Sequence, residues 1–96
     1  MINLETEKQI KIGEKTFTIK RFTFKEKGLI YRAAAKVDPR TGRIKTMDVY
    51  ELMLNALRFG IKEPEMSLEE IENMDGAIAE YIFNKIMEFN TLPFFK

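Results

Sequence analysis

The segment from residue 67 to residue 90 constrains the fold more than any other part of the chain. Ser67 and Glu70 have the spacing of a capping box, in which two side chains satisfy free backbone N–H groups at a helix start. Met66 and Ile71 flank this pair at the positions where a hydrophobic staple closes. The pattern therefore predicts a short helix that begins directly after Ser67.

A long helix is predicted next, from Gly76 to about Asn90, with Asp75 as its N-cap. Apolar side chains occupy most of its circumference, and only a narrow strip is polar. A helix with so wide an apolar surface must be covered by other elements. We expect this helix to form the centre of the core through one main stripe of residues: Ile78, Tyr81, Ile82, Ile86 and Phe89.

The N-terminal part of the chain predicts a β-hairpin. Residues 8–12 and 15–20 alternate between polar and apolar side chains, and a two-residue loop that starts with Gly13 joins them. This loop length places Ile10 opposite Phe17 on the apolar face. A lone hairpin is only marginally stable in water, so we expect that face to lie on helices.

Two more helices are predicted between the hairpin and residue 67. The first opens with a capping box formed by Thr23 and Glu26 and runs to about Val37. The second spans about residues 47–59, and Gly60 is expected to end it in a left-handed conformation. Residues 38–43 are predicted to form a loop, with its two arginines and Lys45 exposed, and residues 60–65 a linker.

The net charge of +1 conceals an asymmetry along the chain. Residues 1–45 contain 12 Lys or Arg and 5 Asp or Glu, whereas residues 46–96 contain 4 and 10. In one interpretation the oppositely charged halves fold against each other. In the other, Arg40, Arg43 and Lys45 form a basic surface for nucleic acid or for an acidic protein.

The pattern as a whole predicts a single small α+β domain over residues 1–96, with the N-terminal β-hairpin packed on a small bundle of three to four α-helices. Residues 1–7 are expected to be a loose leader and residues 91–96 an apolar tail. The tail either folds back onto the core or stays exposed to bind a protein partner. Its candidate partner-binding residues are Leu92, Phe94 and Phe95.

Composition argues against catalysis and metal binding. The chain has no cysteine and no histidine, which removes thiolate ligands, the commonest metal ligand and the commonest general base. The acidic run at Glu69, Glu70, Glu72 and Asp75 lacks the spacing of a calcium loop, and Glu70 already has a capping role. We expect no enzyme, cofactor or metal. Because no membrane span or signal peptide is evident, we expect a cytoplasmic protein.

Three parts carry a resemblance to a known family: the hairpin at residues 10–19, the phrase KRFTFKE at residues 20–26, and the segment 67–90. Their order resembles the small tail assembly chaperones of long-tailed phages and related prophage elements. The resemblance implies a non-enzymatic protein that binds a tape-measure protein through apolar surface and keeps it soluble until tail assembly. The alternatives are a small nucleic-acid-associated protein that uses the basic half, and a self-associating domain.

Overall fold

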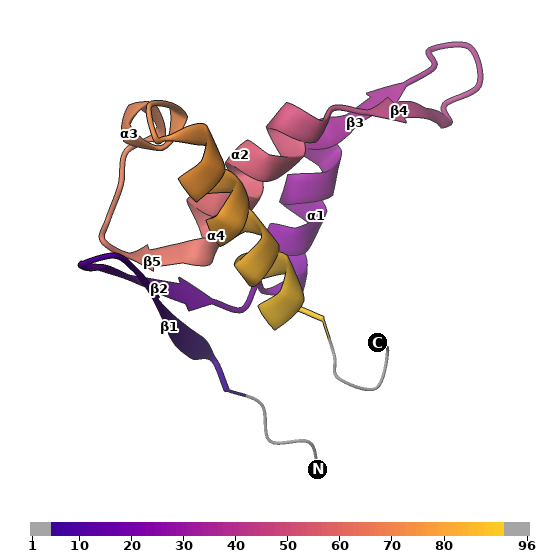
Figure 1. Cartoon of the computed structure of the whole chain (residues 1–96). Coiled ribbons are helices and arrows are strands. Elements are labelled where there is room, and N and C mark those ends of the chain that lie inside the picture. The colour runs from indigo at the N-terminus through magenta and orange to yellow at the C-terminus, as the bar shows by residue number, and fades with distance from the viewer. Residues whose placement is uncertain (1–4, 92–96) are drawn as a thin grey trace.

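The computed structural model describes residues 5–91, which form an α+β fold with four helices and two small sheets (Figure 1). Its elements in chain order are β1 (Glu7–Ile12), β2 (Lys15–Lys20), α1 (Phe24–Ala34), β3 (Ala35–Val37), β4 (Ile44–Met47), α2 (Val49–Gly60), β5 (Ile61–Glu63), α3 (Leu68–Glu72) and α4 (Gly76–Phe89). One sheet has the strand order β1-β2-β5, and the other is the β3–β4 pair. The predicted fold class is confirmed.

The N-terminal hairpin has the predicted register. β1 and β2 are antiparallel with Ile10 opposite Phe17, and Gly13 has the positive φ of 62° that the tight turn requires. β1 begins at Glu7, inside the predicted leader, because Arg21 N–H donates to Thr6 O at 3.1 Å and extends the pairing. The hairpin therefore has its expected apolar face and is slightly longer than predicted.

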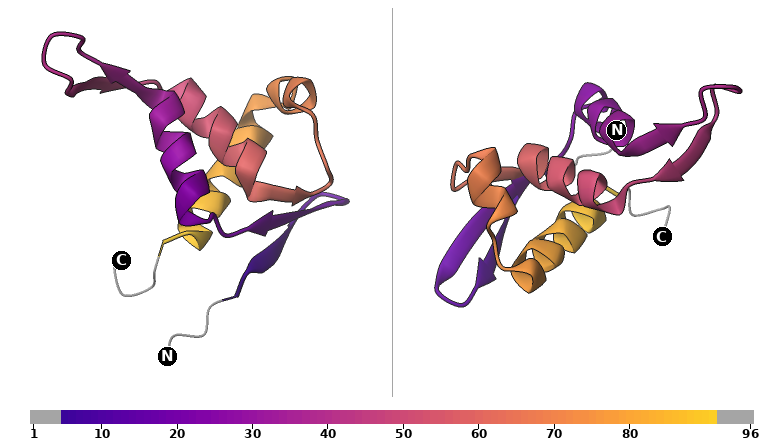
Figure 2. Two further views of the ribbon diagram at one scale, coloured as in Figure 1. Left: turned by 180° about the vertical axis from the view of Figure 1, so that it is seen from behind. Right: turned by 90° about the horizontal axis from the view of Figure 1, so that it is seen from above.

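α4 forms the centre of the core, as its sequence predicts. Ile82 and Ile86 have no exposed surface, and they pack with Phe17 and Ile19 of β2 and with Leu57 of α2. α2 contacts α1 on one side and α4 on the other (Figure 2). Because Phe17 and Ile19 of β2 pack with Ile82 and Ile86, the apolar sides of the three-stranded sheet and of α4 cover each other.

Both predicted capping boxes are present. Thr23 Oγ1 accepts a hydrogen bond from Glu26 N–H at 3.1 Å, and the Glu26 carboxylate accepts one from Thr23 N–H at 2.9 Å. Ser67 and Glu70 form the same pair of bonds at the start of α3. These local signals place the helix starts correctly because the bonding partners lie only three residues apart.

The end of α1 is predicted wrongly, and the two strands that flank the following loop are not predicted. α1 stops at Ala34, and residues 35–37 form β3 instead of the last turn of the helix. Three successive alanines favour a helix locally, but pairing with β4 overrides that preference. The loop predicted at residues 38–43 is present and forms the turn between β3 and β4. α2 begins at Val49 with Asp48 as its N-cap, about two residues later than predicted.

Gly60 is also predicted wrongly. It is the last residue of α2 and has no left-handed conformation; among the described residues, only Gly13 and Gly42 have positive φ. A Cβ atom at this position would lie 2.7 Å from Ile86 Cδ1, so the glycine is required by the close approach of α4. The linker predicted after it contains β5, which pairs with β2.

Candidate functional site

The most prominent feature of the surface is a two-stranded arm, residues 35–47, which we call the ribbon. It projects away from the helices, and it makes no extensive contact with the three-stranded sheet (Figures 1 and 2). Its turn is closed by Asp38, whose N–H donates to Arg43 O at 2.9 Å and whose carbonyl accepts from Gly42 N–H at 2.8 Å. Gly42 has a φ of 73°, which a glycine adopts without strain.

One face of the ribbon is apolar. Ala35 lies opposite Met47 and Val37 opposite Ile44, with a register shift between Lys36 and Val37. In a regular strand Ile44 and Met47, three residues apart, would point to opposite faces, but the bulge brings both to the same face. Val37 is 54% exposed, Ile44 63% and Met47 39%. We call Val37, Ile44 and Met47 the apolar ribbon face.

Large apolar side chains continue into the first turn of α2. Val49 is 63% exposed and Tyr50 is 56% exposed, and only Asp48 separates them from the end of β4. The Tyr50 hydroxyl donates to Glu72 Oε2 at 2.7 Å, and this hydrogen bond raises the pKa of the phenol. Tyr50 is thereby oriented by α3 although most of its ring stays in solvent. Apolar side chains gathered on a surface in this way are typical of an interface.

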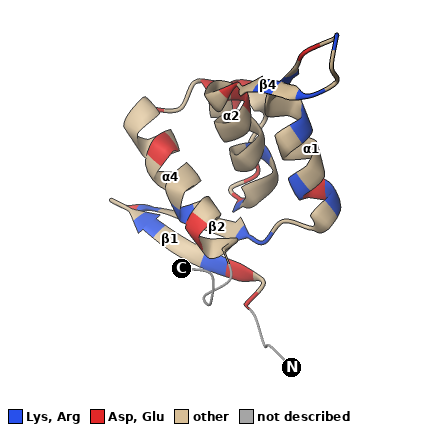
Figure 3. Cartoon of the chain, turned by 90° about the vertical axis from the view of Figure 1, so that its right-hand side faces the viewer, with Lys and Arg blue, Asp and Glu red and all other residues tan. Residues whose placement is uncertain are grey.

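The ribbon also carries the predicted basic residues. Arg40 and Arg43 lie in its turn and Lys45 in β4, and all three are exposed (Figure 3). With Lys36 the ribbon has four cations and a single carboxylate, Asp38, which lies 3.9 Å from Arg40 Nε. Apolar and basic side chains therefore share one projecting element.

Few ion pairs join the two oppositely charged halves of the chain. Within residues 5–91 they are Lys36 with Asp48, at 3.9 Å, and Lys62 with Glu7. The Lys62–Glu7 contact connects β5 to β1, and it raises the pKa of Lys62. Among the described residues, Lys36 is therefore the one cation of the basic half that pairs with a carboxylate of the acidic half, and Arg40, Arg43 and Lys45 of the ribbon make no such pair.

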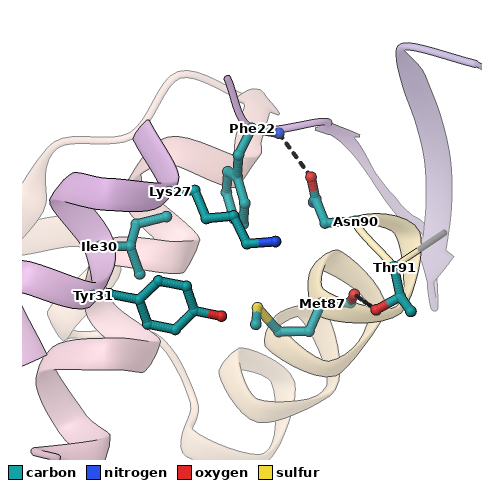
Figure 4. A pocket seen from close by; sticks show the side chains of 7 residues that line it. All are labelled: Phe22, Lys27, Ile30, Tyr31, Met87, Asn90 and Thr91. Atoms are coloured by element: carbon teal, nitrogen blue, oxygen red, sulfur yellow. Dashed lines mark hydrogen bonds between the residues drawn. The ribbon is translucent and has the colours of Figure 1, made fainter. Parts of the chain in front are cut away.

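A small pocket lies between α1 and the C-terminal end of α4 (Figure 4). Its volume is about 80 Å³, well below the several hundred Å³ of typical small-molecule sites. Phe22 N–H donates to Asn90 Oδ1 at 2.7 Å on one side, and Met87 and Tyr31 line the other. Thr91, the last described residue, is at its edge. The candidate partner-binding residues Leu92, Phe94 and Phe95 lie outside the described residues.

The carboxylates of the acidic run have structural roles. Glu70 accepts a hydrogen bond from Ser67 N–H, which lowers the pKa of Glu70, and Asp75 accepts from the N–H groups at the start of α4. Glu72 accepts from Tyr50. No group of three or more metal-binding side chains was found between residues 5 and 91. No helix in that part of the chain has the length and apolarity needed to cross a membrane.

Comparisons with protein-family models, with curated proteins and with solved structures found no match to this chain. Of the predicted surfaces, the structure brings Arg40, Arg43 and Lys45 together on the ribbon.

Sequence reasoning missed the apolar ribbon face. A signal was present, because Asp38 and Gly42 mark a turn and apolar residues lie on both sides of it. The signal was weak, because β3 has only three residues and the bulge breaks the alternation in β4. Pattern analysis needs several alternating positions to detect a strand.

Proposed function

We propose that this chain is a non-enzymatic protein-binding module whose contact surface is the apolar ribbon face. One observation carries the proposal: the ribbon projects from the fold while exposing Val37, Ile44 and Met47. A two-stranded ribbon without another layer packed on its apolar face is marginally stable in water. A protein partner that covers this face would bury its side chains and supply the layer that the ribbon lacks.

In its more specific form, the proposal is an assembly chaperone that holds a tape-measure-like protein. Two observations support it: the resemblance of the hairpin, the phrase at residues 20–26 and the segment 67–90 to tail assembly chaperones, and the exposed apolar ribbon. A long helical client has an apolar stripe that needs cover before assembly. In this proposal Leu92, Phe94 and Phe95 supply a second contact.

The test is a double variant of the ribbon, Val37→Thr with Ile44→Thr. Threonine keeps the β-branched shape that suits a strand, and both positions are exposed, so stability should change by only about 0.5 kcal/mol. We expect the variant to lose capture of a long helical client of the tape-measure type, measured as soluble client on co-expression.

The matched control is Phe24→Thr, because Phe24 is 92% exposed and lies at the start of α1, outside the ribbon. It removes at least as much exposed apolar surface from another element, and client capture should remain. If the ribbon variant holds as much client as the wild-type chain, the apolar ribbon face is not the contact surface.

A nucleic-acid-associated protein is the second candidate, favoured by the cations of the ribbon. The major groove of B-DNA admits a two-stranded β-ribbon, and Arg40, Arg43 and Lys45 are placed to contact phosphates. This function predicts binding to a short DNA or RNA duplex that weakens steeply with salt and is lost when all three become glutamine. Absence of binding at low salt would remove this candidate.

A self-associating domain is the third candidate, because the apolar ribbon face of one copy could cover that of another. It predicts a dimer or larger assembly of the wild-type chain that dissociates in the Val37→Thr, Ile44→Thr variant. Sedimentation velocity at several concentrations distinguishes it, since a chain that stays monomeric leaves the ribbon free for a different partner.

A further inference from the structure

A second surface lies at the other end of the molecule from the ribbon, beside the β1–β2 turn and the connection from β5 to α3 (Figures 1 and 2). It is an open groove of about 790 Å³, within the size range of binding sites in proteins. Apolar side chains from separate parts of the chain line it. Among them are Phe17 of β2, Met74 of the connection before α4, and Ile78 of α4. An apolar side chain of a partner would be covered on several sides here.

Carboxylates surround these apolar side chains. Glu63, Glu65, Glu70 and Asp75 line the groove, and Lys15 is the one cation among its lining residues. No lysine or arginine occurs in the sequence from residue 63 to residue 75. Hydrogen bonding from Ser67 N–H lowers the pKa of Glu70, so that carboxylate is ionised at neutral pH. The groove therefore favours a ligand that combines positive charge with apolar side chains.

The groove is also bordered by a strand edge. β5 pairs with β2 only at Thr18 and Ile19, and Pro64, which has no N–H, follows directly after β5. β2 continues beyond this pairing to Lys15, and among the described strands only β1 pairs with that part. An extended peptide could form main-chain hydrogen bonds there, in line with β5, as in β-strand addition.

We propose that this groove binds an extended segment of a partner protein in which lysine or arginine alternates with apolar residues. Alternate side chains of a strand point to opposite faces, so the apolar set enters the groove. The long, flexible side chains of the lysine or arginine residues reach back to the carboxylates at its border. The strand edge at Lys15–Phe17 supplies backbone pairing. This site is separate from the ribbon in position and opposite to it in charge, so it does not depend on the proposed function.

The test uses a labelled octapeptide of alternating lysine and valine, with an octapeptide of alternating glutamate and valine as its comparison. We expect the basic peptide to bind and the acidic one not to bind. The double variant Glu63→Lys, Glu65→Lys should weaken binding about tenfold, because each reversal replaces an attraction by a repulsion. The control Glu80→Lys, Glu88→Lys makes the same change in net charge on exposed positions of α4, outside the groove.

Wild-type affinity in the control variant, together with amide shifts at residues 15–17 and 74–78 in NMR spectra, would support the proposal. Equal affinity for the two peptides, or shifts confined to the ribbon, would overturn it. Self-association that disappears in the Glu63→Lys, Glu65→Lys variant would also overturn it, since the occupant would then be the basic ribbon of a second copy. The Val37→Thr, Ile44→Thr variant should bind the peptide normally, which separates this test from that of the ribbon.

Discussion

Gly60 shows how a single residue sets the distance between two helices. A Cβ atom there would lie 2.7 Å from Ile86 Cδ1 and 2.8 Å from Ile86 Cγ2, and Ile86 has no exposed surface into which it could move. Gly60→Ala should therefore lower the free energy of unfolding by about 1–3 kcal/mol through overpacking. Urea unfolding monitored by circular dichroism measures the change.

The same experiment has a control in Gly28, which lies within α1 and has no neighbouring atom within 4 Å of an added Cβ. Gly28→Ala should raise the free energy of unfolding by about 1 kcal/mol, because alanine is the better helix former. Adding Ile86→Val to Gly60→Ala removes Cδ1 and should recover part of the loss. If Gly60→Ala stabilises the chain as Gly28→Ala does, the packing argument for Gly60 is wrong.

Glu26 gives the fold a dependence on pH. Burial raises the pKa of its carboxyl group, but hydrogen bonds from Lys20 and Thr23 outweigh that effect, so the pKa lies below its ordinary value of 4.5. A lowered pKa in the folded state contributes stability above pH 4.5 that is lost as pH falls through the folded value. Glu26→Gln should therefore show a smaller loss of stability on acidification than the wild-type chain, measured by urea unfolding across acidic pH.

Lys20→Met is the companion variant, because it removes the hydrogen bond of 2.8 Å from Lys20 Nζ to the Glu26 carboxylate. The pKa of Glu26 should rise in this variant, and NMR titration of the carboxyl carbon can follow it. Identical acid sensitivity in wild-type and Glu26→Gln chains would show that this capping box does not control the pH response.

At the scale of elements, helices could be predicted and short strands could not. Both capping boxes and the apolar circumference of α4 are local in sequence, so pattern analysis placed those elements well. β3 and β5 have only three residues each and exist because they pair with β4 and β2. Such pairing depends on contacts made after the chain folds, which a period of two over three residues does not reveal.

In the candidate site too, local features could be predicted from the sequence, and features that depend on strand pairing could not. The positive charge of Arg40, Arg43 and Lys45 could be predicted from the sequence, because charge needs no partner to be recognised. The apolar ribbon face could not, because it depends on a bulge that moves Ile44 to the side of Met47. Gly60 was misread for a related reason, since its role is set by Ile86, a residue far along the chain.

The ribbon is expected to be the least protected paired element in hydrogen exchange. Its strands pair only with each other, whereas β2 lies between two strands and carries the buried Ile19. Amides of residues 36–46 should exchange through local opening, orders of magnitude faster than those of Ile19 and Ile82. Mass spectrometry of exchanged peptides measures this, and a bound client should slow exchange in the ribbon. Equal protection of the amides in the ribbon and in the core would show that the ribbon does not open separately from the rest of the fold.

At the scale of the whole molecule, charge is separated in space as well as in sequence. The ribbon carries four cations at one end, and the groove is lined by four carboxylates at the other. The net charge of +1 therefore hides one basic surface and one acidic surface. Because both surfaces use charge, added salt should weaken partner binding at each of them. Each end also combines its charge with apolar side chains, which is the combination that gives a protein interface both affinity and orientation.

Removal of residues 92–96 tests whether the fold needs the apolar tail. Ile19, Ile82 and Ile86 are fully buried and pack in a core cluster with Ile10, Phe17, Leu57 and Ile71. The free energy of unfolding of the shortened chain should therefore lie within about 1 kcal/mol of that of the full chain. Client capture on co-expression should fall if Leu92, Phe94 and Phe95 are contacts. Deletion of Lys96 alone controls for the changed terminus. A loss of several kcal/mol would instead assign the tail to the core.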